Sequence, residues 1–202
     1  MKIGVIIMAS GLSNRFGGNK LLAEFKGRRL IDIIVDKTGM LGESFAKDTV
    51  SIDRLVLTRT REVSEYCTGE GVPVILHQLP TRNEAIALGM ERMAGYDACM
   101  FVGCDQPLLR TVSIKRVIEE FLTGGRGIYR LSIDDLIGNP ILFSKEYFPE
   151  LMALPEKKGG AYLARKYPDE VRLVSAVDKW ELADIDTPDD LVLLSSVGRN
   201  EK

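Results

Sequence analysis

The chain has 202 residues, 45% of them apolar and 28% charged, with a formal net charge of −2 at pH 7. This balance excludes a disordered chain, and the near-neutral charge excludes a protein whose main task is to hold a nucleic acid along a basic groove. The three cysteines lack the number and spacing of a disulfide framework or a zinc site, which indicates reduced thiols in a cytoplasmic protein. The apolar opening run is too short to span a membrane. We expect one domain over residues 1–197 and a short tail, residues 198–202.

Short apolar runs alternate with amphipathic segments along the whole chain. A continuous apolar strand over residues 3–9, of the kind buried on both faces, precedes a helix over residues 30–41. The elements that follow are strand 55–57, helix 62–66, strand 72–76, helix 83–93, strand 98–103, helix 113–122, strands 127–131 and 140–143, helices 145–152 and 160–166, strand 171–174 and a last helix from residue 188. This regular alternation predicts an α/β fold with a mostly parallel, doubly wound sheet between helices.

Unusual residues follow the first predicted strand, and such sheets bind ligands at the carboxyl ends of their strands. Gly11, Gly17 and Gly18 allow backbone N–H groups to approach an anion, and Arg15 and Lys20 add fixed positive charge. The segment is neither a Walker A loop, since Leu21 follows the lysine, nor a Gly-x-Gly-x-x-Gly turn. It therefore predicts a binding loop for a nucleoside triphosphate.

Carboxylates occupy two further segments that we expect at the same edge. Asp105 follows the strand over residues 98–103 and is a candidate ligand for Mg²⁺ held against phosphate oxygens. Thr187 and the acids after it form an ordinary helix start, with Thr187 as N-cap. That start does not account for Asp184 and Asp186, so one of these two is a candidate second Mg²⁺ ligand.

Five motifs in one order resemble the MobA-like NTP transferases, the family of the molybdenum-cofactor guanylyltransferases and cytidylyltransferases, over nearly the whole chain. They are Gly11-x-x-x-Arg15-x-Gly17-x-x-Lys20, Arg82-Asn83-Glu84-Ala85-Ile86-Ala87-Leu88-Gly89, Cys104-Asp105-Gln106-Pro107, Gly138-Asn139-Pro140-Ile141-Leu142-Phe143 and Asp184-Ile185-Asp186-Thr187-Pro188. The resemblance implies a three-layer α/β/α, Rossmann-like fold of the nucleotide-diphospho-sugar transferase type. It also implies an N-terminal half that binds the nucleotide and a C-terminal half that binds the acceptor.

The implied reaction moves a nucleotidyl group from a triphosphate to a phosphorylated acceptor and releases pyrophosphate. A phosphate monoester is already anionic, so positioning and charge neutralisation suffice and no general base is needed. Lys20 and Arg15 would stabilise the departing pyrophosphate, and Asp105 would hold Mg²⁺ with help from Asp186 or Asp184. The implied nucleotide-binding residues are Ala9, Ser10, Gly11, Arg15, Gly17, Lys20 and Asn83.

The resemblance favours the cytidylyltransferase branch, because Ala9-Ser10-Gly11 stands where guanylyltransferases usually carry a double glycine. The added bulk of Ala9 and Ser10 would narrow the base pocket toward a pyrimidine, so CTP is favoured over GTP. Molybdopterin is the implied acceptor, with Asn139 and Lys158 as candidate contacts. A molybdoenzyme or a maturation protein is a possible recipient of the product, and no nucleic acid or membrane partner is expected.

Other interpretations remain open. A sugar phosphate or another phosphorylated metabolite could be the acceptor, because the triphosphate half would be the same. A non-catalytic nucleotide-binding module would be expected to have lost its metal ligands and cations, yet Lys20 and Asp105 are present. A dinucleotide-dependent dehydrogenase is excluded, since Thr58-Arg59 stands where an acid should meet the ribose. The single histidine, His77, is interpreted as structural.

Overall fold

The computed structural model describes residues 1–11, 15–45 and 49–197, and a seven-stranded sheet runs through them with the strand order β5-β4-β1-β6-β8-β7-β9. The strands are β1 (Lys2–Ala9), β4 (Ser51–Thr58), β5 (Val74–Leu76), β6 (Ala98–Gly103), β7 (Ile128–Ile133), β8 (Leu136–Ser144) and β9 (Val171–Ser175). All seven strands predicted from the sequence are therefore found, the fourth of them with the predicted bounds.

The sheet is parallel except at β8. Strand β1 pairs in parallel with β4 and β6, and β7 pairs in parallel with β9, whereas β8 is antiparallel to both β6 and β7. A two-residue turn at Asp134 and Asp135 joins β7 to β8, and so short a connection permits only antiparallel pairing. The prediction of a mostly parallel sheet is confirmed. The alternation of strands and helices in the sequence did not indicate that β8 runs antiparallel to its neighbours.

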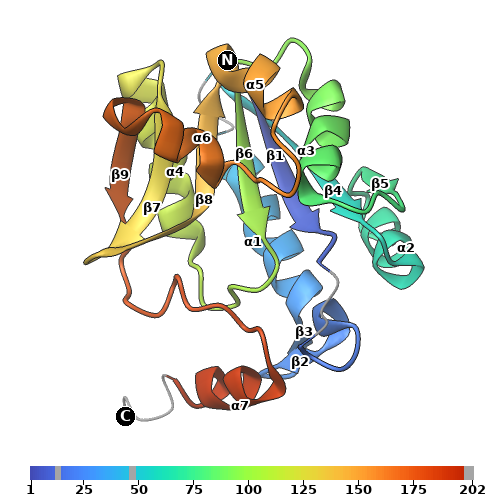
Figure 1. Cartoon of the computed structure of the whole chain (residues 1–202). Coiled ribbons are helices and arrows are strands. Elements are labelled where there is room, and N and C mark those ends of the chain that lie inside the picture. The colour runs from blue at the N-terminus through green and yellow to red at the C-terminus, as the bar shows by residue number, and fades with distance from the viewer. Residues whose placement is uncertain (12–14, 46–48, 198–202) are drawn as a thin grey trace.

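Helices cover both faces of the sheet, as the three-layer prediction requires (Figure 1). Helices α1 (Leu30–Ser44), α2 (Arg61–Gly69) and α4 (Thr111–Gly124) pack on one face. Helices α3 (Arg82–Met90), α5 (Phe148–Met152) and α6 (Ala161–Lys166) pack on the other, and 3₁₀ turns extend α3 and precede α5. Two separate apolar clusters form the core, one on each side of the sheet.

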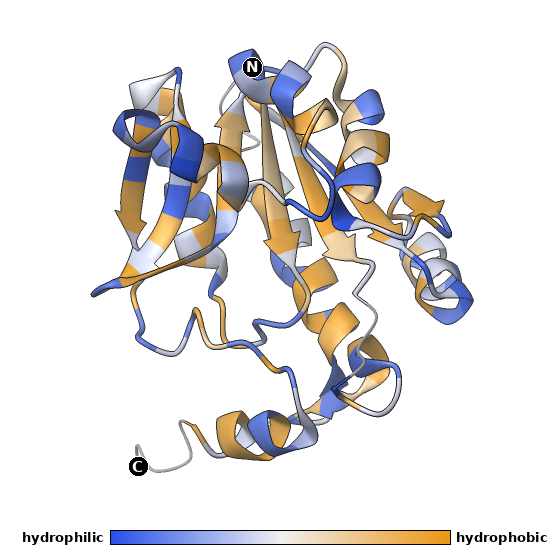
Figure 2. Ribbon diagram, viewed as in Figure 1, coloured by the Kyte–Doolittle hydropathy of each residue, from blue (hydrophilic) through white to orange (hydrophobic). Residues whose placement is uncertain are grey.

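The central strands explain why both clusters form. In β1, Val5 and Ile7 belong to the cluster under α1 and α4, while Ile6 belongs to the cluster under α3. All three are 0% exposed, as expected for a strand that alternates its side chains between two covered faces. Figure 2 shows the same pattern, since the central strands are coloured as hydrophobic and the blue hydrophilic segments lie mainly on the helices and loops.

A small third unit lies beyond the carboxyl edge of the sheet (Figure 1). It consists of the hairpin β2 (Glu24–Phe25) and β3 (Arg28–Arg29), the start of α1, and α7 (Pro188–Ser196). Phe25, Leu30, Ile33, Ile185 and Leu194 form its core, each no more than 7% exposed. This packing brings residues 184–187 back to the edge where β1 and β6 end.

Other expectations concern the chain as a whole. Cys67, Cys99 and Cys104 are buried free thiols, as the sequence indicated. None of the helices in the described residues combines the length and apolarity needed to cross a membrane. The predicted tail, residues 198–202, lies outside the described residues.

Candidate nucleotide-binding site

The loop after β1 returns to the sheet through Lys20. Gly17 has φ +75°, a left-handed conformation that favours glycine, and its neighbourhood is open to solvent. Asn19 caps the short 3₁₀ turn Lys20–Leu22, because its side-chain oxygen accepts a hydrogen bond from the Leu21 N–H. Residues 12–14 of the predicted loop lie outside the described residues. The cap fixes the direction in which the Lys20 side chain leaves the backbone.

The Lys20 ammonium group joins three segments that are far apart in the sequence. Its Nζ donates to the carbonyl of Ile185 at 2.6 Å and lies 3.2 Å from Asp105 Oδ2 and 3.4 Å from Asp186 Oδ1. The lysine side chain is only 10% exposed, so these contacts satisfy a cation that is largely withdrawn from water. The structure thus brings together Lys20, Asp105 and Asp186, three of the residues that the sequence suggested for the site.

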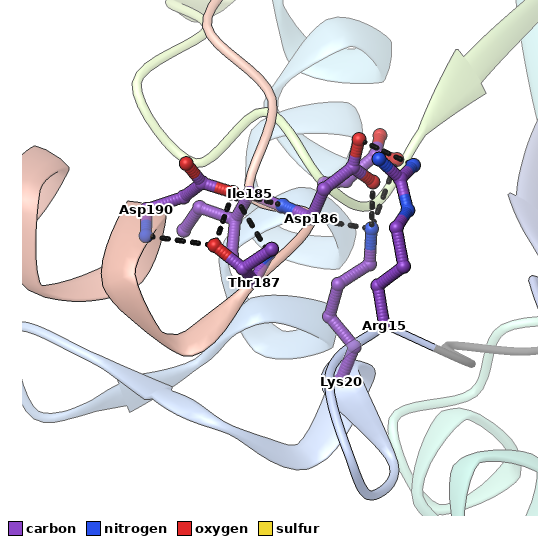
Figure 3. A network of polar contacts seen from close by, with 7 residues as sticks. Arg15, Lys20, Ile185, Asp186, Thr187 and Asp190 are labelled. Carbon is purple, nitrogen blue, oxygen red and sulfur yellow. Dashed lines mark hydrogen bonds and ion pairs between the residues drawn. The ribbon is translucent and has the colours of Figure 1, made fainter.

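Arg15 contacts the carboxylate of Asp186, which Lys20 also contacts (Figure 3). Its Nη2 lies 2.7 Å from Asp186 Oδ2, and its side chain is 71% exposed. Asp186 is in turn fixed by the start of α7, where Asp190 Oδ2 accepts from the backbone N–H groups of Asp186 and Thr187. Thr187 forms the predicted N-cap, as part of a capping box with Asp190. An exposed arginine paired with one carboxylate can exchange that partner for a phosphate at little cost.

Asp184 differs from Asp186 in its surroundings. Asp184 lines the cavity described below together with Asp105, whereas Asp186 is held by Lys20 and Arg15. Burial of its carboxyl group, followed by repulsion from Asp105, raises the pKa of Asp184 to about 6. The free protein therefore holds more negative charge at this point than its cations neutralise.

Replacing Asp184 by Asn should stabilise the metal-free protein at neutral pH. With the pKa raised above its ordinary value of 3.8, the folded protein binds the extra proton between about pH 4 and pH 6, so stability falls as the pH rises from about 4 to about 6 and stays at the lower level above that. Although protein atoms crowd its carboxyl group, the residue as a whole remains open to solvent, and water weakens both effects. The expected gain for the variant is therefore on the order of 1 kcal/mol above pH 6 and near zero at pH 4. Urea unfolding at several pH values measures it. Equal effects at both pH values would contradict this account.

The acidic residues suit a divalent cation that also binds substrate phosphates. Among the described residues, no three acidic, His or Cys side chains are placed to enclose a metal ion by themselves. Asp105 and Asp186 nevertheless converge on one point, since both contact the same Lys20 ammonium group. Mg²⁺ characteristically takes one or two carboxylates and completes its shell with water and phosphate oxygens. Oxygen donors of this number and charge fit that pattern.

A cavity of about 850 Å³ opens beside these carboxylates, at the carboxyl edge of the sheet. It is bounded by the end of β1, the start of α3, the end of β6, the start of β8 and the loop before α6. This volume lies within the range of about 300–1,000 Å³ that small-molecule sites occupy. The cavity extends from the nucleotide side of the sheet, at β1, to the predicted acceptor side, at β8 and α6.

On the nucleotide side, Ser10 and His77 form a fixed polar pair on the cavity wall. Ser10 Oγ donates to the carbonyl of Leu57 at 2.9 Å, and His77 Nε2 lies 2.7 Å from the same Oγ. His77 Nδ1 accepts the Leu79 N–H, so its proton is on Nε2, and burial lowers the pKa of the ring. Ala9 is 1% exposed and packs in the core under α1, so of the two residues expected to narrow the base pocket, Ser10 alone lines the cavity.

Four further predicted residues lie in or beside the cavity. Asn139 and Lys158 are exposed and line it on the acceptor side. Asn83 uses its side-chain oxygen to accept the Lys157 N–H at 2.9 Å, which ties the start of α3 to the loop before α6. Its predicted contact with the base or ribose would therefore have to come from the amide nitrogen. Gly11 lines the cavity directly.

Glu181 and Lys37 support the site, and neither was predicted. Glu181 is 0% exposed and accepts four hydrogen bonds, from the N–H groups of Arg110, Val177 and Asp178 and from the Ser113 hydroxyl. It thereby fixes the chain that leads to Asp184. Lys37 Nζ donates to the Pro107 carbonyl at 2.5 Å, and burial lowers its pKa to about 8. A glutamate in an irregular segment and a lysine on a helix carry no sequence signal for these roles.

Replacing Gly103 by Ala should impair the site with little effect on folding. A Cβ atom at this position would lie 2.6 Å from Asp105 Oδ1, so the Asp105 carboxylate would have to turn away. We expect weaker binding of divalent cation and nucleotide, by roughly tenfold, with a change in stability below about 1 kcal/mol. Calorimetric titration of Mn²⁺ and nucleotide into the protein measures the binding, and urea unfolding measures the stability. Unchanged binding would show that the carboxylate can keep its position.

The sequence profile of the MobA-like NTP transferase domain matches residues 5–171 of the chain. Among solved structures, Rv0371c from Mycobacterium tuberculosis H37Rv superimposes with a TM-score of 0.81 at 22% identity, covering 97% of this chain and 99% of the other. Another structure of that protein is a complex with manganese, with a TM-score of 0.76 at 18% identity over 98% of this chain and 100% of the other.

Two more solved structures are similar over almost their whole length. A nucleotidyl transferase from Methanothermobacter, Mth528, has a TM-score of 0.77 at 23% identity, covering 96% of each chain. CMP:2-keto-3-deoxy-manno-octonic acid synthetase, complexed with CTP, has a TM-score of 0.70 at 12% identity, covering 97% of this chain and 98% of the other. At these identities the likeness shows the fold alone. No match was found among curated proteins.

Proposed function

The chain belongs to the MobA-like NTP transferase family, and from that premise we propose that it moves CMP from CTP to a small phosphorylated acceptor, molybdopterin or the molybdenum cofactor, and releases pyrophosphate. The observation that carries the proposal is the convergence of two cations, Arg15 and Lys20, with the carboxylates of Asp105 and Asp186 beside the large cavity. A nucleotide-binding module without catalysis would be expected to have lost these carboxylates and cations.

In the proposed reaction, an oxygen of the acceptor phosphate attacks the α-phosphorus of the nucleotide, and the bond to the β-phosphate oxygen breaks. Arg15 turns from Asp186 toward the β- and γ-phosphates, where its exposed side chain can follow the departing pyrophosphate. Lys20 remains at the junction and adds a fixed positive charge in a site with little water, where it acts more strongly than in bulk solvent. Because the attacking group is already anionic, no side chain has to remove a proton.

Asp105, together with Asp184 or Asp186, would hold Mg²⁺ or another divalent cation. Bound there, the cation would neutralise phosphate charge and keep the triphosphate in line with the acceptor. The manganese complex of a protein with the same fold supports a divalent cation as cofactor. Of the two acids, we propose Asp184 as the partner of Asp105, because both line the cavity while Asp186 is engaged by the two cations.

CTP is the proposed donor because the cavity wall beside the base is polar and constrained. The Ser10 hydroxyl is held between His77 and the Leu57 carbonyl, so it cannot withdraw to admit a larger purine without breaking two hydrogen bonds. The fold is also that of a synthetase whose structure holds CTP. We place the reaction in the cytoplasm, with a molybdoenzyme or maturation protein as recipient of the product.

Pyrophosphate release tests the proposal directly. It should be measured with Mg²⁺ and either CTP or GTP, each with and without molybdopterin in its free and molybdate-loaded forms, with Asp105→Ala as the control. Release that needs both CTP and the pterin, and that disappears in the variant, is expected. Release with GTP would identify a guanylyltransferase, and release with a sugar phosphate in place of the pterin would reassign the acceptor. Nucleotide binding without release from any acceptor would contradict a transferase.

A further inference from the structure

Five cations line the acceptor side of the cavity: Lys157, which pairs with Glu156, and four others. Arg82, Arg130, Lys158 and Arg165, named here the acceptor-side basic cluster, come from α3, β7, the loop before α6, and α6. None of them makes a salt bridge within the described residues. The only acids of the described chain that line the cavity are Asp105 and Asp184, at its other end. The acceptor end is therefore strongly positive.

Arg130 is the least expected member, because it lies inside an apolar strand. Its neighbours in β7, Tyr129 and Leu131, are 0% exposed and pack on the α4 side, so Arg130 projects to the opposite face, toward α6. Its Nη2 makes only long contacts, 3.5 Å and 3.4 Å, with the carbonyls of Ile137 and Gly138, and its buried Nε finds no hydrogen-bond acceptor in the part of the chain that is described. Burial, and then the charge of Arg165, lowers the pKa of the guanidinium group.

Two arginines facing each other in a partly buried cavity, without a carboxylate, are unfavourable in the free protein. Arg130 loses hydration on burial and is repelled by the charge of the exposed Arg165, and no carboxylate of the described chain lines this end of the cavity. Such an arrangement is stabilised when a ligand supplies the negative charge, and guanidinium groups suit this role because they form paired hydrogen bonds to phosphate or carboxylate oxygens. The cluster therefore has the chemistry of an anion site that a ligand completes.

The sheet gives the distance between this cluster and the reacting centre. Asp105 follows β6, and β7 is two strands away in the order β6-β8-β7. Across the sheet, Arg130 is aligned through Ile141 with Phe101. Neighbouring strands lie about 4.8 Å apart, which places the backbone of Arg130 roughly 10 Å from that of Phe101 and at least as far from Asp105. A single phosphate group is too small to contact both the carboxylate-bound centre and the cluster.

We propose that the acceptor-side basic cluster binds a second anionic group of the acceptor, a phosphate or a carboxylate, roughly 10 Å from the phosphate that attacks the nucleotide. The acceptor is accordingly an elongated dianionic or polyanionic molecule, and Arg130 and Arg165 are specificity-determining residues. The inference rests on the proposed function for the identity of the attacking group, and it narrows the acceptor: molybdopterin carries a single phosphate, so the second anionic group would belong to its molybdate-loaded form or to another phosphorylated metabolite. It predicts that short phosphate monoesters without a second anionic group are poor acceptors.

The side-chain Nε–Hε signal of Arg130 in ¹⁵N NMR reports on this site without any turnover. The signal is assigned by its loss in Arg130→Gln, and inorganic phosphate and acetate are then titrated separately into the free protein. We expect a saturable shift with phosphate, acetate or both, which identifies the preferred anion. Arg165→Gln should weaken that binding roughly tenfold, whereas Arg116→Gln, an exposed cation of α4 on the other face of the sheet, should leave it unchanged.

Several results would overturn the inference. One is an Arg130 signal that neither anion shifts, and another is a loss of anion binding in Arg116→Gln as large as in Arg165→Gln. A third is a signal that saturates with Mg–CTP and then no longer responds to phosphate, which would assign the cluster to the nucleotide. With the acceptor in hand, Arg165→Gln should raise its KM about tenfold while kcat and the KM for CTP stay within about twofold. A shift with phosphate but no pyrophosphate release from any acceptor would retain the anion site and reject only the proposed function.

Discussion

Replacing Asp105 by Asn should lower kcat for pyrophosphate release by about 100-fold or more while the protein stays folded. The carboxylate lies 3.2 Å from the Lys20 ammonium group and faces the cavity, and its charge is what the proposed cation requires. An amide of the same shape keeps the packing but not the charge, and removing one preorganised electrostatic contact commonly costs 10²–10³ in rate. The backbone hydrogen bond from the Ile185 N–H to the Asp105 carbonyl, 2.8 Å, is unaffected by the substitution. It keeps the segment after β6 joined to the segment before α7.

Asp53→Asn is the matched control for this variant. Asp53 also accepts from a lysine, Lys2, and from the Tyr96 hydroxyl, but it lies near the opposite edge of the sheet, where β1 and β4 begin. Its rate should stay within about twofold of the unmodified protein, because an exposed ion pair away from the site contributes little. If Asp105→Asn retained most of its activity, the metal role of this residue would be wrong.

Replacing Glu181 by Gln should destabilise the protein by about 3–5 kcal/mol, the largest stability effect expected from a single change of shape-matched side chains. The carboxylate is fully buried and accepts three backbone N–H groups and one hydroxyl. In the variant, the amide NH₂ group would replace one carboxylate oxygen and would face an N–H or O–H donor that now has no acceptor. Each buried polar group left without a hydrogen bond costs about 1–3 kcal/mol. Urea unfolding gives the change in free energy from the shift of the midpoint at constant slope.

Glu119→Gln provides the comparison on the neighbouring helix. Glu119 pairs with Lys115 at 3.4 Å on the surface of α4 and is 48% exposed, so its loss should change stability by less than about 0.5 kcal/mol. The Glu181 variant should also bind divalent cation less well, since Glu181 holds the start of the segment that carries Asp184 and Asp186. A loss of stability no larger than that of Glu119→Gln would show that water or backbone shifts replace the lost acceptor.

Lys20 has two tasks in this arrangement that are easily confused. In the free protein it cross-links the loop after β1, the end of β6 and the segment before α7, through Asp105, Ile185 and Asp186. In the proposed reaction, Asp105 turns to the cation together with Asp184, and the charge of Lys20 becomes available to phosphate. The attraction between Lys20 and the two carboxylates thus keeps the site assembled in the absence of ligand. When the ligand binds, these charged side chains exchange one another for phosphate and cation while the backbone stays in place.

The sequence by itself determined the order and kind of the main elements and much of the nucleotide side of the site. The strand over residues 98–103 and the cap at Thr187 were predicted with their observed positions, because apolar runs and capping residues are local signals. The meeting of the loop after β1 with Asp105 also followed, since residues after neighbouring parallel strands meet at one edge of a sheet, whereas Asp186 reaches this edge only through the packing of α7. The family resemblance drawn from the five motifs is confirmed by the profile match.

Only the tertiary structure decided the rest, because the remaining features depend on contacts between residues far apart in the chain. The reversal of β8, the hydrogen bonds that bury Glu181 and the Ser10–His77 pair all arise from packing that no local period encodes. The placement of Arg130 and Arg165 near each other likewise requires β7 and α6 to line one cavity. An arginine within the apolar run Ile128–Ile133 was the one local sign of that site, and its meaning depends on which face of the sheet it occupies.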